Sequence, residues 1–290
     1  MNMKARAMIP FDGNDSKAVA AASRVYKKLR RRLIPIPESS GNVTVSPLTD
    51  AFLQDLTEVS LSRFGEDPLA AFNTQIALLS AHPFTCEVDL VEKIIFISDT
   101  FVEALEFAAA QASLINIFNR IRKLLTETSN DPHGLLDGIN KSRNALHSMY
   151  MTRMLLHIIG EKSAPAIAKV LPKEYKLFVH TQLVAATIFA LLHEQAHLEI
   201  EAGRFIPELT VDLKNAFVNM KLTEDQKEEY ASDLWAARQI KKARRGSFIR
   251  AASFFFFNQW VVDYLLHNEQ SHHPPAFNRI QHMMQAMPDM

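Results

Sequence analysis

A long apolar run leads directly into a polar pentapeptide near the middle of the C-terminal half. Residues 183–192 read LVAATIFALL, and HEQAH follows at 193–197. The whole stretch 175–202 lacks Gly and Pro, so it predicts one long helix that ends at Gly203. Because a continuous apolar run indicates burial, this helix is expected to carry histidines and a glutamate into the core.

The pentapeptide has the H-E-x-x-H pattern of zinc sites. Four residues of helix turn through about 400°, so His193 and His197 lie one turn apart on nearly the same face. Two imidazoles in that arrangement can bind one Zn²⁺. Glu194 is one step round the helix and can reach a water at the metal as a general base. The structural alternative is a pair of helix histidines satisfied by their neighbours.

A catalytic zinc needs a third protein ligand and an open position. The extension H-E-x-x-H-x-x-G-x-x-H is excluded, because Ile200 stands where that pattern needs glycine and Gly203 where it needs histidine. The acidic stretch at 224–239 offers Glu229 and Asp233, four residues apart on one helix face. One can bind the metal while the other orients a ligand histidine through its second ring nitrogen.

Glu228 is the nearest rival to Glu229. It lies about 100° round the helix from that residue. With Lys221 and Lys227 nearby, we interpret it as part of a solvated face. Glu229 is therefore the expected ligand.

Composition restricts the class of protein. The chain has 290 residues with 32 basic and 32 acidic side chains, which gives no support for nucleic-acid or membrane-surface binding. Cys86 stands alone, so the fold does not depend on a disulfide and a cytoplasmic location is expected. The apolar runs at 183–192 and 254–257 are shorter than the roughly 18 residues of a membrane span.

The remaining patterns predict a mainly α fold with a small β element. Residues 93–98 are β-branched and apolar, which is typical of a short strand. Thr223 is the expected cap of the acidic helix. Helices are expected over residues 15–33, 47–64, 68–81, from 101 onward, 139–159, 175–202, 223–243 and 247–267. We expect residues 1–45 to form an N-terminal helix and connector, and residues 46–290 to form one domain closed by segment 271–290.

Three motifs in order carry a family resemblance. They are HEQAH at 193–197, E-x-x-x-D at 229–233 and HPPAFNRI at 273–280. Together they resemble the gluzincin peptidases, and more narrowly the Lit family of phage-exclusion peptidases. The segment KIIFISDTFVEAL at 93–105 is similar to the strand and helix that precede the zinc helix in those enzymes. The resemblance covers roughly residues 88–285.

The resemblance implies a gluzincin-like fold that holds one Zn²⁺ per chain. Its implied zinc ligands are His193, His197 and Glu229, with Glu194 as the base. It also implies that Asp233 holds a ligand histidine, that His273 stabilises the oxyanion, and that Arg279 braces this turn from the C-terminal helix.

The same resemblance implies an endopeptidase that cleaves a protein. The Lit family cuts a host translation elongation factor, which makes such a factor one candidate substrate. Two alternatives stay open: a non-catalytic zinc-containing binding protein, and a regulatory peptidase that cuts a repressor. The second would share the zinc helix but lack H-P-P-x-x-x-R-I, so the C-terminal motif disfavours it.

Overall fold

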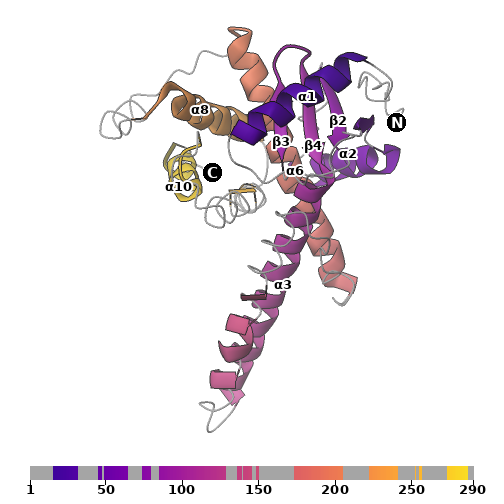
Figure 1. The fold of residues 1–290 in the computed structure, drawn as a ribbon. Helices are drawn as coiled ribbons and strands as arrows, with labels where there is room; N and C mark the ends of the chain where they lie inside the picture. Colours follow the sequence, from indigo (N-terminus) through magenta and orange to yellow (C-terminus); the bar gives the residue numbers. More distant parts are fainter. Residues whose placement is uncertain are drawn as a thin grey trace.

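Helices dominate the computed structural model, and a small sheet accompanies them (Figure 1). The residues that the structure describes are 16–31, 45–47, 49–64, 74–79, 85–128, 136–138, 140–145, 148–149, 173–204, 222–240, 252, 255–256 and 273–286. The main elements are α1 (Ser16–Arg31), β1 (Val45–Pro47), α2 (Asp50–Phe64), β2 (Gln75–Leu79), β3 (Cys86–Asp89), β4 (Ile94–Ser98), α3 (Asp99–Thr128), α6 (Lys173–Glu201), α8 (Glu224–Gln239) and α10 (Ala276–Ala286). The fold is thus mainly α with a small β element, as the sequence predicts.

The sheet has four strands in the order β1-β2-β4-β3. β2 and β4 run parallel, whereas β1 and β3 pair antiparallel with them, so β3 forms one edge. Successive side chains of a strand point to opposite faces. Ile94 and Phe96 of β4 accordingly join one apolar cluster, and Ile95 and Ile97 join another.

Helix α1 covers the outer face of the sheet and crosses the strands in Figure 1. Its buried face carries Ala18, Ala21, Ala22, Val25 and Tyr26. These side chains pack with Leu79 and Phe96 in the outer cluster. The N-terminal helix is therefore part of the packed structure and reaches the edge strand β3.

The inner face of the sheet packs on the main core, with α6 at its centre. Helix α6 contacts α2, α3 and α8, and it also reaches β3 and β4. Its apolar run is fully enclosed, and Phe189 packs edge-on against Phe256. Helix α10 packs against α8. This arrangement brings the C-terminal part of α6 between the acidic helix and the edge strand.

Local end signals set the limits of the two site helices as expected. Thr223 caps α8 with its side-chain oxygen on the Gln226 N–H, and the Gln226 side chain accepts a hydrogen bond from the Thr223 N–H. This capping box satisfies two amides at the helix start. Gly203 follows α6 with φ of 65°, a conformation that glycine adopts without a steric penalty.

The predicted helix over residues 68–81 is wrong where the structure describes it, because Gln75–Leu79 is strand β2. Pairing with β1 and β4 outweighs the helical propensity of this Ala- and Leu-rich segment. The strand predicted at 93–98 is confirmed as β4, while β1 and β3 were not predicted. The helices expected at 139–159 and 247–267 lie mostly outside the described residues.

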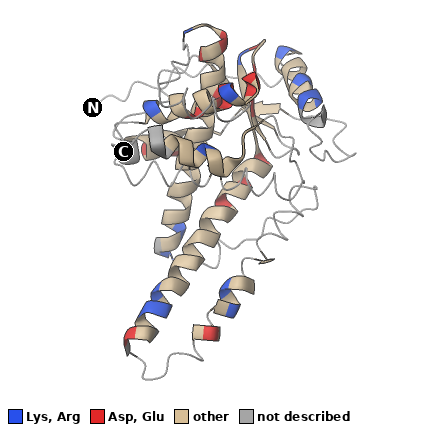
Figure 2. Ribbon diagram, turned by 90° about the vertical axis from the view of Figure 1, so that its left-hand side faces the viewer, with Lys and Arg blue, Asp and Glu red and all other residues tan. Residues whose placement is uncertain are grey.

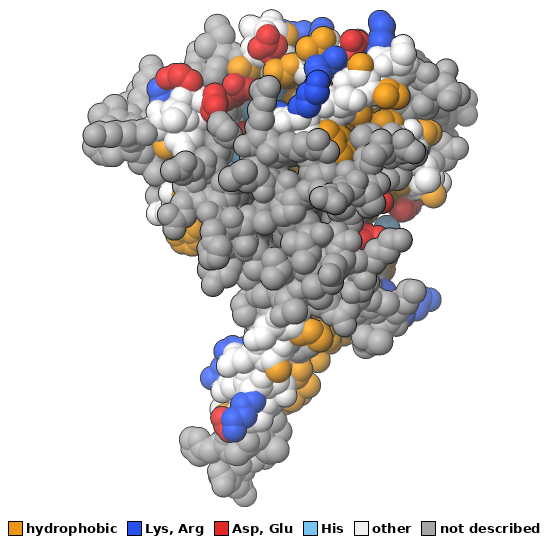
Figure 3. All heavy atoms as spheres, in the orientation of Figure 1, with side chains coloured by type: hydrophobic (Ala, Val, Ile, Leu, Met, Phe, Trp, Pro, Cys, Tyr) orange, Lys and Arg blue, Asp and Glu red, His pale blue; other side chains and the backbone are white. Residues whose placement is uncertain are grey.

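Helices α3 and α6 are each long and apolar enough to span a membrane by length and composition. Half of the most apolar window of α3 and 72% of that of α6 are buried inside the protein. Buried core helices of soluble proteins meet the same criterion. The ends that project from the body carry lysines and arginines (Figure 2). Hydrophobic side chains also lie on the surface of the projecting part (Figure 3), and Ile121 and Leu124 of α3 are exposed.

Candidate metal centre

Helix α6 delivers three polar side chains to the edge of the core. The apolar run before them buries this helix on several sides, so His193 and Glu194 are only 2% and 6% exposed. His197 is one turn later and half-buried. The helical spacing places both imidazoles toward α8.

Glu229 of α8 meets the two histidines. The His193 and His197 Nε2 atoms are 3.3 Å apart. Glu229 Oε2 lies 3.2 Å from His193 Nε2, and Glu229 Oε1 lies 3.7 Å from His197 Nε2. One ligand atom from each of the three residues lies within 4.8 Å of the others. The arrangement can hold a metal ion.

The chemistry of these donors fits Zn²⁺. Two imidazole nitrogens and one carboxylate oxygen form a ligand set of catalytic zinc sites. Glu229 Oε2 is also fully buried and forms no well-aligned hydrogen bond within the described residues, although cationic groups surround it. A buried carboxylate oxygen of this kind favours a cation in front of it.

Asp233 and Arg279 hold the His193 ring at Nδ1, the nitrogen on the side away from Glu229. Asp233 Oδ1 lies 2.9 Å from His193 Nδ1. The Arg279 guanidinium donates two hydrogen bonds, of 2.6 and 2.7 Å, to the Asp233 carboxylate. Arg279 is 1% exposed and lies over the Phe256 ring, 4.9 Å from its centroid. This chain of contacts fixes the ring with Nε2 toward the candidate metal position.

Electrostatics favour positive charge at this position. Burial would lower the pKa of His193, but Asp233 and Glu229 raise it to about 10. Burial would likewise raise the pKa of Glu229, yet His273, His193 and Arg279 hold it well below its usual range. Two carboxylates thus stay ionised around the His193 ring, where a proton or a metal ion would neutralise them.

Glu228 is closer to the site than the sequence suggested. Its carboxylate lies 2.7 Å from His197 Nδ1, so the interpretation as a merely solvated side chain is wrong. The hydrogen bond with His197 lowers the pKa of Glu228. The pair orients the second histidine as Asp233 orients the first. Adjacency to Glu229 was the sole sequence signal for this role.

Glu194 lies on the opposite side of the candidate metal position, next to β3. Its Oε2 accepts a hydrogen bond of 3.0 Å from the Val88 N–H. Burial raises the pKa of Glu194, and the Glu87 carboxylate adds to the rise. The base predicted from the motif is therefore held by an edge strand that the sequence did not reveal.

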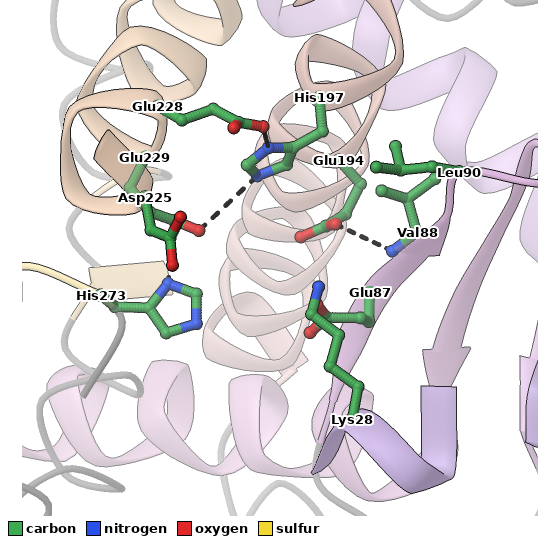
Figure 4. A pocket seen from close by; sticks show the side chains of 10 residues that line it. All are labelled: Lys28, Glu87, Val88, Leu90, Glu194, His197, Asp225, Glu228, Glu229 and His273. Carbon is green, nitrogen blue, oxygen red and sulfur yellow. Dashed lines mark hydrogen bonds and ion pairs between the residues drawn. The ribbon is translucent and has the colours of Figure 1, made fainter. Parts of the chain in front are cut away.

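Five of these residues line one cleft of about 230 Å³ (Figure 4): Val88, Glu194, His197, Glu228 and Glu229. Glu194 and Val88 form one wall, and Glu229 forms the other. His273 lies at the rim with Nδ1 2.9 Å from Glu229 Oε2, and its second ring nitrogen is on the cleft side in Figure 4. Lys28 of α1 also lines the cleft, so residues from both ends of the chain meet here.

Gln195, an unspecified position of the motif, anchors helix α6. Its side-chain oxygen accepts a hydrogen bond of 2.6 Å from Thr74 Oγ1, directly before β2. Its amide nitrogen donates to Glu199, one turn on, at 2.9 Å. The motif alone carried no signal for this contact, because Thr74 is 121 residues away.

The family model described as Peptidase U49 matches residues 160–289. The match covers less than half of the chain but includes α6, α8 and α10, and with them every proposed ligand. The match supports the assignment of this protein as a peptidase. No curated protein and no solved structure matches the chain. Helix α1 and the sheet lie before the matched residues.

Proposed function

We propose that the protein is a zinc-dependent endopeptidase that cleaves a protein substrate. The observation that carries this proposal is the trio of His193, His197 and Glu229, with Glu194 lining the same cleft as His197 and Glu229. Structural zinc sites are closed by four protein ligands, whereas catalytic sites have three and an open position. The cluster found among the described residues has three members.

Zn²⁺ held there would supply a Lewis acid that polarises the scissile carbonyl and makes water acidic. Glu194 would accept the proton of the attacking water and pass it to the leaving amine. Its raised pKa, caused by burial, makes its carboxylate a stronger base than an exposed glutamate. The Val88 N–H keeps that carboxylate turned toward the cleft.

His273 is proposed to stabilise the carbonyl oxygen as negative charge develops. When both ring nitrogens are protonated, Nδ1 forms an ion pair with Glu229 and the other nitrogen can donate a hydrogen bond into the cleft. A donor placed before the reaction needs no reorganisation during it. Asp233 and Arg279 would act by holding His193 in place.

The substrate proposal rests on the resemblance to the Lit peptidases. A host translation elongation factor in the cytoplasm is the first protein to test, in the setting of phage defence. A non-catalytic zinc protein would not need the buried Glu194 carboxylate beside the ligands. The presence of Glu194 therefore favours the peptidase over this alternative.

A survey of new protein N-termini in cells that express the protein tests the proposal. Wild type is compared with Glu194→Gln, which keeps the side-chain shape but removes the base. Glu201→Gln, an exposed glutamate on the same helix, is the matched control. Cleaved termini should appear with wild type and Glu201→Gln and be absent with Glu194→Gln. Equal termini in all three samples would exclude the proposed chemistry.

A further inference from the structure

Two basic residues of α1 bracket the backbone amide that holds the candidate base. Arg24 and Lys28 are four residues apart, so they project from one face of the helix. Arg24 donates two hydrogen bonds, of 2.8 and 2.7 Å, to the Asp89 carboxylate. Lys28 forms an ion pair with Glu87. Asp89 and Glu87 are the residues on either side of Val88 in β3.

Strand β3 needs such support because it is an edge strand. It pairs with β4 along one side. Along the other side, the Val88 N–H points to Glu194 instead of a neighbouring strand. Glu87 and Asp89 are buried although both carry charge, at 7% and 6% exposed. Their ion pairs with α1 therefore contribute to the position of the strand.

We propose that α1 is a clamp that fixes β3, so that the Val88 amide holds the Glu194 carboxylate in a productive orientation. Arg24 and Lys28 are then positioning residues. This inference rests on the proposed role of Glu194 as the base. It extends the functional unit beyond residues 160–289 to the N-terminal helix.

Glu194 needs the Val88 amide because a glutamate side chain is long and can adopt several conformations. A carboxylate on a flexible stem needs hydrogen bonds to stay in one orientation, and the Val88 N–H supplies one. A displacement of about 1 Å near a reacting group can slow turnover about 100-fold. Without Arg24, the buried Asp89 carboxylate would retain the Glu92 N–H but lose its cationic partner. The strand would then shift to hydrate that carboxylate.

Arg24→Met tests the clamp, and Lys27→Met is the matched control. Lys27 is exposed on the same helix, and its replacement removes the same charge. Hydrogen–deuterium exchange of the peptide 85–89 reports the strand directly. Zinc affinity is measured by chelator competition. Values of kcat and KM are measured on the substrate found in the terminus survey.

Arg24→Met should make exchange in peptide 85–89 about 10-fold faster, because local opening becomes easier. Its kcat should fall roughly 10- to 100-fold, while KM and zinc affinity stay nearly constant. Arg24→Lys keeps the charge but loses the paired hydrogen bonds, so it should recover part of the loss. Lys27→Met should match wild type in every measurement.

Unchanged exchange in Arg24→Met would overturn the clamp. Faster exchange with wild-type kcat would overturn the link from the strand to Glu194. A wild-type protein that cleaves nothing would reject the proposed function but not the clamp, since exchange is measured without substrate. In that case Glu194→Ala must also speed exchange in peptide 85–89, and an unchanged rate there would overturn the contact between base and strand.

Discussion

Replacing Glu229 with Gln removes the carboxylate charge from the candidate metal centre and keeps the side-chain shape. Its two oxygens lie 3.2 Å from His193 Nε2 and 3.7 Å from His197 Nε2, so both ligand rings lose the same negative partner. The free energy of Zn²⁺ binding to a site with four protein ligands is about 10–16 kcal/mol, which is roughly 3 kcal/mol per ligand. We expect Glu229→Gln to weaken Zn²⁺ binding about 100-fold or more.

Glu228→Gln is the matched control because it makes the same chemical change at the neighbouring residue. Glu228 has a side chain that is 41% exposed and meets His197 at Nδ1, away from the candidate metal position. The glutamine oxygen can still accept a hydrogen bond from that nitrogen. We expect Zn²⁺ binding to weaken by about 10-fold at most, the low end for a residue that orients a ligand.

Competition with a chromophoric zinc chelator at neutral pH measures both affinities, and circular dichroism confirms that each variant is folded. Wild-type affinity in Glu229→Gln would refute a carboxylate ligand at this position. A larger loss in Glu228→Gln would move the third ligand one residue toward the N-terminus. Equal losses would mean that the two carboxylates act only through the charge of the cleft.

Four further outcomes are expected. Arg279→Met should lower the free energy of unfolding by about 3–5 kcal/mol in urea, because it breaks the buried ion pair between Arg279 and Asp233; a change below about 1 kcal/mol would contradict this. The Arg partners of Asp233 and Asp89 hold both pKa values low against the effect of burial. Their stabilisation is complete above the unfolded pKa of about 3.9 and is lost as pH falls through the lower folded values, so acid titration should show declining stability below about pH 4. His273→Ala should reduce kcat about 10²–10³-fold with unchanged zinc content, and His180→Ala, at a half-buried residue outside the cleft, should be silent; the reverse order would reassign the oxyanion donor. A strong chelator should lower the melting temperature, and an unchanged value would argue against a metal within the core.

Local patterns in the sequence were enough to predict the two helices that carry the candidate site. Helical periodicity placed His193 and His197 on one face, and the spacing of Glu229 and Asp233 placed both acids on another. Gly203 and Thr223 marked helix ends that the structure contains. Such features depend on neighbours within about one helical turn, so a single sequence reveals them.

The tertiary structure decided which side chains meet. The contact between His197 and Glu228 joins residues 31 positions apart, and the Val88–Glu194 hydrogen bond spans 106 positions. Segment 75–79 became a strand because two partners pair with it, although its composition favours a helix. Spacing along a chain determines which residues share a helix face. Contacts across strands and between distant helices depend on packing and on the pairing of buried charges, which arise only when the whole chain has folded.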